Sequence, residues 1–363
     1  MKIIQVSDLH IDSKMETNFT ISQAKQRNNE ILVTFENLFN VMENEDYQAM
    51  LIVGDMFDTK KMSSKSFSYI IELIKKHSSK LFFYVPGNHD QEANLIKHSD
   101  LPNNLKVFDE EFSKYNLNEN IVVGGIKLTE TNTLTLSKQI DFEKNKLNIL
   151  MLHGELTKQS NKVNNETIFI GDIKNKNIDY LALGHIHSYS TNKIDDRCMS
   201  VYSGCLEPRG FDEFGDKGYV SILIDEQSKK ITHKFVKFQS RTFHNINIDI
   251  TDLENSRQIL ELIYKNLKDI KNDDIIKITL TGKFDANITK GIDLIESELS
   301  RQYYFVKIID KSKLKINIED YKSNFTLKGI FIRQVLESKK IPEELKDEVI
   351  ITGIKALEKE EID

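Results

Sequence analysis

Seven metal-binding side chains lie in five groups along the first 187 residues of this sequence. They are Asp8 and His10, then Asp55, then Asn88, then His153, and finally His185 and His187. Each group follows a short apolar run typical of a buried strand, and the carboxyl ends of such strands meet at one rim of an α/β sheet. We therefore expect the seven side chains to converge. Imidazole, carboxylate and amide oxygen suit manganese, iron or zinc, and they argue against a thiolate site.

Two divalent cations about 3.5–4 Å apart need one carboxylate that bridges them. Asp55 is the residue that we expect to do so. The other ligands divide into one set of Asp8, His10 and His187 and a second set of Asn88, His153 and His185. Such a centre keeps positive charge and attracts an anionic substrate such as a phosphate ester. Bound cations also lower the pKa of a water from about 15.7 to about 7, which supplies a nucleophile at neutral pH.

The residues after Asn88 have the chemistry to assist a leaving group. His89 can lie at the rim of the metal site and donate a proton to the departing oxygen. Asp90 can accept from the other ring nitrogen and hold the orientation of His89. The alternative for Asp90 is a cap on a helix that begins near residue 91.

Composition limits the class of protein. Of the 363 residues, 39% are hydrophobic and 29% are charged, as in soluble proteins with one or more full cores. No stretch approaches the roughly 18 apolar residues of a membrane span, and the N-terminal residues do not resemble a signal peptide. We therefore expect no association with a membrane. Cys198 and Cys205 are the two cysteines, so we expect no disulfide framework and a cytoplasmic protein. The net charge of −6 argues against tight binding of nucleic acid without excluding it.

Periodicity predicts three segments, with domains at residues 1–240, 241–317 and 318–363. In the first, strands alternate with helices, the helices at 21–44 and 63–76, and a polar surface loop is expected at 161–176. The second has β-α-β-α-β order, as in a small α+β domain. The third is helical and amphipathic. It either folds back as a terminal helix pair or presents an apolar face to a partner's coiled coil.

The order of these motifs resembles that of the calcineurin-like metallophosphoesterases over residues 1 to about 240, and every ligand position is filled. Within that family, the chain is similar to the SbcD nuclease subunits and to the YhaO-type bacterial homologues. The similarity lies in Gly54-Asp55-Met56-Phe57-Asp58, in the run at residues 203–213 and in residues 353–358.

The resemblance implies a two-sheet sandwich flanked by helices, followed by a small capping domain and a helical tail. It also implies a manganese-dependent DNA nuclease that acts in DNA end processing and repair. Its expected partners are DNA, an SMC-like ATPase with a long coiled coil, and a second copy of the chain. No G-x-x-x-x-G-K-[ST] run occurs, because Gly282-Lys283 lacks the rest of the motif. ATP use would therefore belong to the partner.

The sequence leaves alternatives open for four basic residues and for the function of the metal centre. Arg209 can contact a substrate phosphate, or it can form a salt bridge within its loop. Lys60, Lys61 and Lys65 can meet a nucleic-acid backbone, or they are ordinary solvated side chains. The metal centre would also serve a phosphodiesterase or phosphatase for small substrates. A scaffold that only binds a partner would not need Asn88 or His89.

Overall fold

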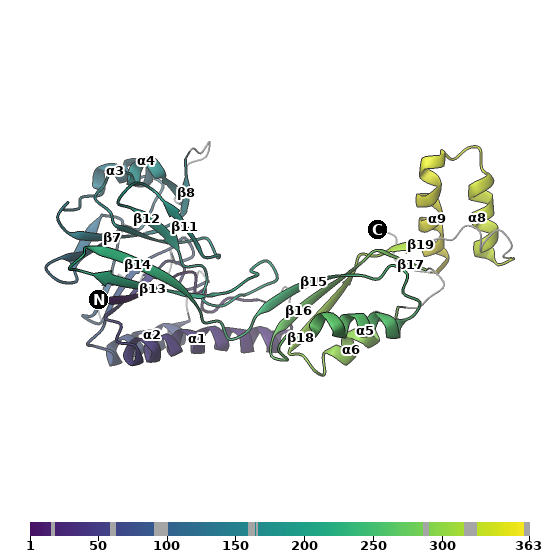
Figure 1. Cartoon of the computed structure of the whole chain (residues 1–363), viewed down its shortest axis with the longest axis horizontal. Helices are drawn as coiled ribbons and strands as arrows, with labels where there is room; N and C mark the ends of the chain where they lie inside the picture. Colours follow the sequence, from purple (N-terminus) through teal and green to yellow (C-terminus); the bar gives the residue numbers. More distant parts are fainter. Residues whose placement is uncertain are drawn as a thin grey trace. The chain divides into compact units, whose positions relative to one another are not determined.

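The computed structural model describes the chain except for residues 16–18, 59–62, 91–100, 159–163, 165, 286–289, 316–324 and 359–363. Contacts divide the chain into two compact units, Met1–Phe243 and His244–Asp363. Both units are labelled by element in Figure 1. The predicted tail and all of the predicted capping domain except residues 241–243 fall in the second unit, and the division between them stays a prediction.

The first unit contains two six-stranded sheets. The first sheet has the order β14-β13-β1-β2-β3-β4. Its strands are β1 (Lys2–Val6), β2 (Ala49–Val53), β3 (Leu81–Val85), β4 (Leu105–Val107), β13 (Gly218–Asp225) and β14 (Lys230–Lys237). Strands β1 to β4 are parallel, whereas β13 pairs antiparallel with both β1 and β14. The parallel strands therefore end at the same rim of the sheet.

The second sheet has the order β11-β12-β10-β7-β6-β5. Its strands are β5 (Ser113–Asn116), β6 (Ile121–Gly125), β7 (Leu147–His153), β10 (Tyr180–Gly184), β11 (Ser190–Lys193) and β12 (Met199–Tyr202). The four inner strands are parallel, and both edge strands are antiparallel. A separate two-stranded pair follows β7 and is formed by β8 (Glu155–Thr157) and β9 (Thr167–Phe169).

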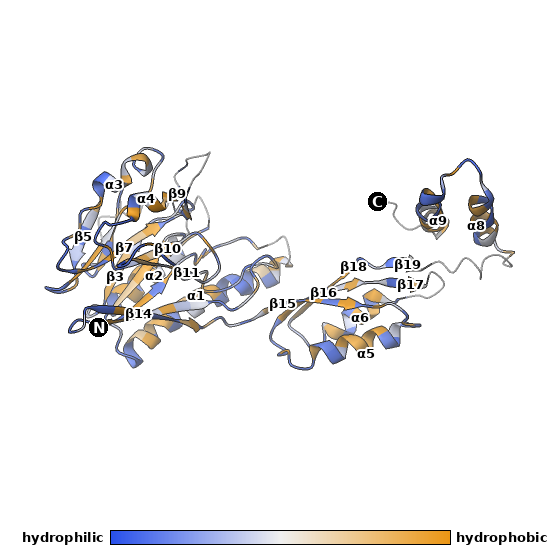
Figure 2. Cartoon of the chain, turned by 45° about the horizontal axis from the view of Figure 1, so that its top comes forward, coloured by the Kyte–Doolittle hydropathy of each residue, from blue (hydrophilic) through white to orange (hydrophobic). Residues whose placement is uncertain are grey.

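The two sheets pack face to face and are covered by helices on their outer sides. A cluster that includes Leu51, Phe83, Ile149 and Ala182 fills the space between the sheets. On the outer side of the first sheet, Phe39 of α1 stacks on Phe82 with ring centroids 5.4 Å apart. The helices of this unit are α1 (Ile21–Asn44), α2 (Ser64–Lys76), α3 (Leu136–Gln139) and α4 (Ile170–Ile173), with a 3-10 turn at Thr133–Thr135. Figure 1 shows α1 and α2 on one side of the sandwich and α3 and α4 on the other. Figure 2 shows the apolar strands between them.

Helix α1 begins at a capping box, because Thr20 and Gln23 satisfy each other's backbone N–H groups. Its buried face carries apolar residues three or four apart, among them Ile31, Phe35 and Leu38. Arg27 lies on the same face and is fully buried. It is held by Glu207, whose carboxylate also accepts from Thr34 and from the backbone of Ser240. This network fastens α1 to the loop that follows the second sheet.

The second unit contains a three-stranded sheet and a helical hairpin. The sheet has the order β15-β16-β18 and is formed by β15 (Phe243–Asp249), β16 (Ile275–Thr281) and β18 (Phe305–Asp310). Its apolar face packs with α5 (Ser256–Leu267) and α6 (Ile292–Leu299). A short pair, β17 (Lys283–Asp285) and β19 (Lys313–Lys315), follows. The hairpin of α8 (Leu327–Glu337) and α9 (Glu343–Glu358) has a separate small core around Ile332, Val335, Ile350 and Ile354.

The predicted α/β class with two helix-flanked sheets is confirmed. The predicted helix at 21–44 coincides with α1, and that at 63–76 is α2 with Ser63 as its N-cap. The predicted loop at 161–176 is wrong in part, because β9 and α4 lie within it and bury Ile168 and Ile173. Among the described helices, none is both long and apolar enough to span a membrane.

Candidate metal centre

The predicted ligands come from the ends of five parallel strands, three in the first sheet and two in the second. Four of them have a backbone φ in the left-handed region: Asp8 at 52°, His10 at 46°, Asp55 at 49° and His185 at 97°. Residues with a Cβ rarely adopt this conformation, and such strain gathers at functional sites. The loop that carries Asp55 holds the backbones of Asp8 and His10, because their N–H groups donate to the carbonyls of Gly54 and Asp55.

One group of ligand atoms is formed by Asp8, His10 and His187, which lie close enough to bind one cation. The Nε2 atoms of His10 and His187 are 3.2 Å apart, and Asp8 Oδ1 lies 3.7 Å from His187 Nε2. Asp8 and His10 are buried, and His187 is partly exposed. The backbone N–H of His185 donates to both oxygens of Asp8 and fixes the carboxylate.

A second group is formed by Asp8, Asp55 and His153, all buried. Asp55 Oδ2 lies 3.3 Å from His153 Nε2 and 3.9 Å from His10 Nε2, so this carboxylate stands between the two groups. Asn88 Oδ1 lies 3.2 Å from the same Nε2 atom of His153. This is the arrangement that a bridging carboxylate requires.

His185 takes a different place from the other predicted ligands. Its ring lies edge-on to that of His153, with centroids 5.5 Å apart. Burial and the nearby charge of His153 lower the pKa of His185, which favours the neutral form that ligates metals. Among the described residues, the close ligand groups do not include His185, and its role as a ligand stays a prediction.

Three of the predicted ligand histidines have the Nδ1 atom engaged by an oxygen. His153 Nδ1 lies 3.0 Å from the carbonyl of Val53, His10 Nδ1 lies 3.1 Å from Asp58 Oδ1, and His187 Nδ1 lies 2.7 Å from Glu213 Oε1. If each Nδ1–H donates to its oxygen, each Nε2 presents a lone pair to the site, as in metal-ligating histidines. The lone pairs of His10 and His187 then face each other, and a cation between them removes that repulsion. The donor set thus fits divalent metals.

Asp55 and His153 behave as a buried ion pair. Burial would raise the pKa of Asp55, but the charge of His153 and its hydrogen bond hold that pKa well below its usual range. Burial would lower the pKa of His153, but Asp55 raises it to about 9. The site therefore stabilises positive charge beside Asp55, which a cation supplies as well as a proton does.

Two glycines allow these side chains to approach the backbone. A Cβ on Gly54, where φ is 78°, would lie 2.0 Å from His153 Nδ1. A Cβ on Gly87 would lie 2.2 Å from Asp55 Oδ1. Neither position leaves room for a side chain, which accounts for the glycine before Asp55 and the glycine before Asn88.

His89 lies at the rim as expected, but its partner differs from the prediction. The His89 side chain is 45% exposed, and its Nδ1 atom lies 3.1 Å from Asp58 Oδ1. We expected Asp90 to hold His89. Instead, the buried carboxylate of Asp90 accepts from the backbone N–H groups of Met56, Phe57 and Gly87. Asp90 thus fixes the two loops that carry Asp55 and Asn88, and Asp58 takes the place beside His89.

Arg209 is engaged by carboxylates. Its guanidinium donates to Glu213, and its NH1 group lies 3.5 Å from Asp58. This agrees with the alternative of a salt bridge within the loop. Lys65 lines a cavity of about 700 Å³ between α1 and α2, whereas Lys60 and Lys61 lie outside the described residues.

Asp58 and Glu213 are the residues that sequence reasoning missed. Both stood in the motifs that carry the family resemblance, three residues after Asp55 and at the end of the 203–213 run. Their position in those motifs was the available indication. Their contacts, to residues 26 to 48 positions away, were not readable from spacing.

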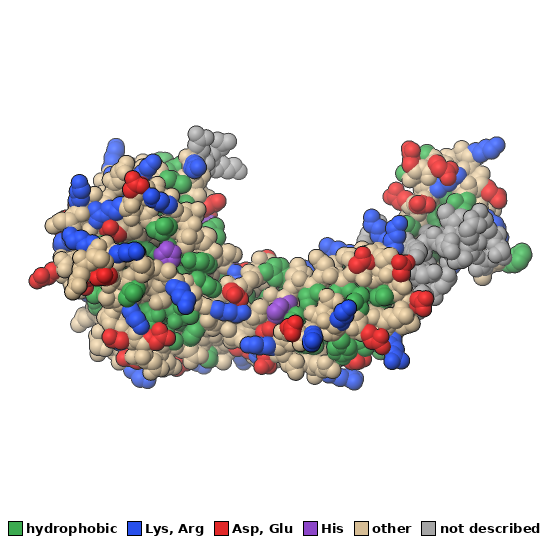
Figure 3. Space-filling view, viewed as in Figure 1, with side chains coloured by type: hydrophobic (Ala, Val, Ile, Leu, Met, Phe, Trp, Pro, Cys, Tyr) green, Lys and Arg blue, Asp and Glu red, His purple; other side chains and the backbone are tan. Residues whose placement is uncertain are grey.

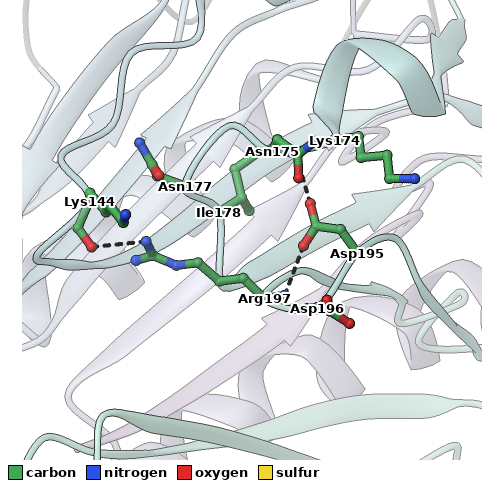
Figure 4. Close-up of a pocket in the computed structure, with 8 residues that line it drawn as sticks. All are labelled: Lys144, Lys174, Asn175, Asn177, Ile178, Asp195, Asp196 and Arg197. Atoms are coloured by element: carbon green, nitrogen blue, oxygen red, sulfur yellow. Dashed lines mark hydrogen bonds between the residues drawn. The ribbon is translucent and has the colours of Figure 1, made fainter.

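A second cavity, of about 380 Å³, lies at the other end of the second sheet, where β7, β10 and β12 begin. Figure 4 shows its lining, with Arg197 bonded to the carbonyl of Lys144. The guanidinium of Arg197 also pairs with Asp179 at 2.8 Å. The described lining contains none of the predicted site residues.

Comparison with known proteins agrees with this geometry. The family model for calcineurin-like phosphoesterases matches residues 1–189. The chain is 24% identical to the DNA double-strand break repair protein Mre11 of Sulfolobus acidocaldarius, over 84% of this chain and 80% of that protein. It is 22% identical to the uncharacterized metallophosphoesterase YhaO of Bacillus subtilis, over 78% and 72%. It is 24% identical to a subunit of the nuclease SbcCD of Staphylococcus epidermidis, over 71% and 75%. The chain therefore belongs to the calcineurin-like phosphoesterase family and is a metal-dependent phosphoesterase.

Proposed function

We propose that this chain is a two-metal phosphodiesterase that hydrolyses DNA, as the nuclease subunit of a complex with an SMC-like coiled-coil ATPase. The observation that carries the proposal is the position of Asp55, whose carboxylate lies between His153 and His10. The ligand atoms of Asp8, His187 and Asn88 surround it. Two cations, manganese by preference, would be held by these residues and by His185.

The cations would supply a nucleophilic water and neutralise charge on the phosphoryl group. The protein's own residues supply the proton for the leaving oxygen. Asp58 is positioned to accept from His89 Nδ1, so Nε2 is the atom that passes a proton to the departing alkoxide. Asp90 keeps the loop of His89 in place through Gly87.

The relatives support DNA as the substrate, since Mre11 is named for the repair of DNA breaks and the Staphylococcus epidermidis relative is named as part of a nuclease. In this proposal, residues 241–317 form a capping domain that contributes to DNA binding, and the protein works in the cytoplasm as a homodimer. The distribution of surface charge supports DNA as the substrate less strongly than the relatives do. Figure 3 shows basic and acidic side chains interspersed over the visible face of each unit, an arrangement that would also suit a phosphodiesterase or phosphatase for small substrates.

Residues 318–363 are proposed to bind the ATPase. The α8–α9 hairpin leaves several apolar side chains exposed: Leu327 at 67%, Leu345 at 45%, Ile330 at 43% and Leu357 at 40%. Apolar residues on a helical hairpin are the kind of surface that a coiled coil covers. A pull-down with the coiled-coil segment of the ATPase should succeed with the native chain and fail with a Leu327→Asp/Leu345→Asp variant.

The deciding experiment is manganese-dependent cleavage of end-labelled double- and single-stranded DNA. The native chain should release nucleotides or oligonucleotides, and both Asp55→Ala and His89→Ala should abolish the release. His233→Ala, on edge strand β14, serves as the control and should cleave as the native chain does. Hydrolysis of bis-p-nitrophenyl phosphate while DNA stays intact, with and without the ATPase, would favour the small-substrate alternative. Absence of hydrolysis of either substrate would refute the proposal.

A further inference from the structure

We propose that Arg209 is a positioning residue that joins the two histidines of one metal site through two carboxylates. The inference rests on the metal centre of the proposed function. It concerns how the chain holds His10 and His187, and it assigns Arg209 a role other than binding a substrate phosphate.

Glu213 connects Arg209 to His187. Arg209 donates from Nε at 3.2 Å and from NH2 at 2.9 Å to Glu213 Oε1, and its backbone N–H donates to Oε2 at 2.7 Å. The same Oε1 atom lies 2.7 Å from His187 Nδ1. The Glu213 side chain is only 6% exposed, so its geometry is set by these partners and not by water.

Asp58 connects Arg209 to His10 in the same way. Its Oδ1 atom lies 3.5 Å from Arg209 NH1 and 3.1 Å from His10 Nδ1. The chain of contacts therefore runs from His10 through Asp58, Arg209 and Glu213 to His187. It closes where the two Nε2 atoms meet at 3.2 Å.

An arginine is suited to this position. Its planar guanidinium presents donors on separate edges, so it can serve two carboxylates at once, whereas a lysine presents one compact charge. It also offsets the repulsion between two mostly buried carboxylates. His187 is held from a further side, because the buried Lys217 donates from Nζ to its carbonyl at 2.6 Å.

The same contacts argue against direct phosphate binding by Arg209. Its Nε and NH2 groups donate to Glu213, its NH1 group lies 3.5 Å from Asp58, and NH2 also lies 3.4 Å from His187 Nδ1. A phosphate would have to displace carboxylates that hold the histidines. The group of His10, Asp58 and His89 also meets the geometric requirement for a cation. However, Arg209 already brings positive charge to Asp58 Oδ1, so we assign these contacts to orientation and not to a third metal.

The test is calorimetric titration of the metal-free, full-length chain with Mn²⁺. The native chain should bind two ions. Arg209→Met should weaken one of the two about 10- to 100-fold, as for other residues that orient metal ligands, and leave the second unchanged. Arg209→Lys should recover only part of the loss. Arg197→Met, which removes an arginine paired to a carboxylate at the far end of the second sheet, should bind both ions as the native chain does.

A double-mutant cycle separates this role from a general loss of folding. Asp58→Asn should weaken the same ion, and the Arg209→Met/Asp58→Asn variant should lose less than the sum of the two single losses, because both act through one set of contacts. Additive losses would contradict the inference. So would unchanged Mn²⁺ binding in Arg209→Met together with a raised KM, the result expected of a phosphate-binding arginine. If the native chain binds no Mn²⁺, the proposed metal centre itself is wrong and the inference falls with it.

Discussion

Asp55 contacts both the backbone of His89 and the side chain of His153, a predicted metal ligand. Its Oδ1 atom accepts the N–H of His89 at 3.0 Å, while its Oδ2 atom lies 3.3 Å from His153 Nε2. One carboxylate thus positions both the site that would activate a water and the residue that would protonate the leaving group. Their relative placement depends on this side chain.

Asp55→Asn should therefore lower kcat/KM by at least about 100-fold, because a catalytic metal contributes several kcal/mol and each 1.36 kcal/mol is a factor of ten. The amide can still accept from His89, so the fold should persist. Initial rates on bis-p-nitrophenyl phosphate at saturating Mn²⁺ measure the effect. Asp141→Asn, whose side chain is 86% exposed, is the control. A less than tenfold loss would contradict a bridging role for Asp55.

Asp90→Asn should act mainly on stability. The buried carboxylate accepts from three backbone N–H groups, and an amide has only one oxygen to offer. The free energy of unfolding should fall by about 2–3 kcal/mol, the cost of an unsatisfied buried donor. Urea denaturation followed by circular dichroism measures it. Lost hydrolysis with unchanged stability would instead favour the predicted role of Asp90 in orienting His89.

Gly87→Ala should disrupt the metal centre, because the new Cβ would meet Asp55 Oδ1 at 2.2 Å and displace it. Mn²⁺ affinity should fall at least about tenfold, as it does when a ligand loses its orientation. Gly171→Ala in α4 is the matched control, since nothing lies within 4 Å of its Cβ. That substitution should preserve Mn²⁺ binding and, if anything, stabilise the helix. Equal affinities in the two variants would rule out the steric argument.

Glu30 should make stability depend on pH. Burial would raise its pKa, but hydrogen bonds from Arg241 and the charge and hydrogen bond of Arg27 lower it below the ordinary value. Because the folded pKa lies below the unfolded one of about 4.3, the stabilisation is fully present above that value. It is lost as pH falls through the folded pKa.

The free energy of unfolding of the native chain should therefore exceed that of Glu30→Gln by about 1–2 kcal/mol at pH 7. The difference should shrink as the pH falls below the unfolded pKa of about 4.3. Urea denaturation from pH 7 to below that pKa measures both. Glu72→Gln removes an exposed carboxylate, 69% exposed and paired with Lys75, and should show little difference at any pH. A difference for Glu30→Gln that does not change with pH would show that the charge is not responsible.

Sequence reasoning predicted the site most successfully for polar side chains at or just after the end of an apolar strand. Asp8, Asp55 and His153 follow apolar strands, and parallel strands bring their carboxyl ends together, so convergence could be predicted without a structure. The short strands β4, β5 and β8 could not, because three or four residues are too few to show a period. The N-terminal helix α1 has 24 residues and was predicted to its ends.

The partners of the ligands were harder to predict than the ligands. Whether Asp58 or Asp90 holds His89 depends on which carboxylate the loops bury, and both lie within three residues of a predicted site residue in the sequence. Asp90 turns inward because three backbone donors of two loops need an acceptor there. The sequence around Asp90 does not show that these backbone donors need an acceptor, because two of them belong to the loop of Met56 and Phe57.

Strand β1 lies between β2 and β13, so the strand that leads to Asp8 has one neighbour ending at Val53 and another starting at Gly218. The segment between β1 and β13 is far longer than the segment between β1 and β2, and closing so long a loop is slow compared with local folding. A chain emerging from the ribosome can pair β1 with β2, and β2 with β3, early, but the other side of β1 stays open until most of the first unit has been made. The strand that leads to Asp8 is therefore framed on both sides only after the chain has been made as far as β13.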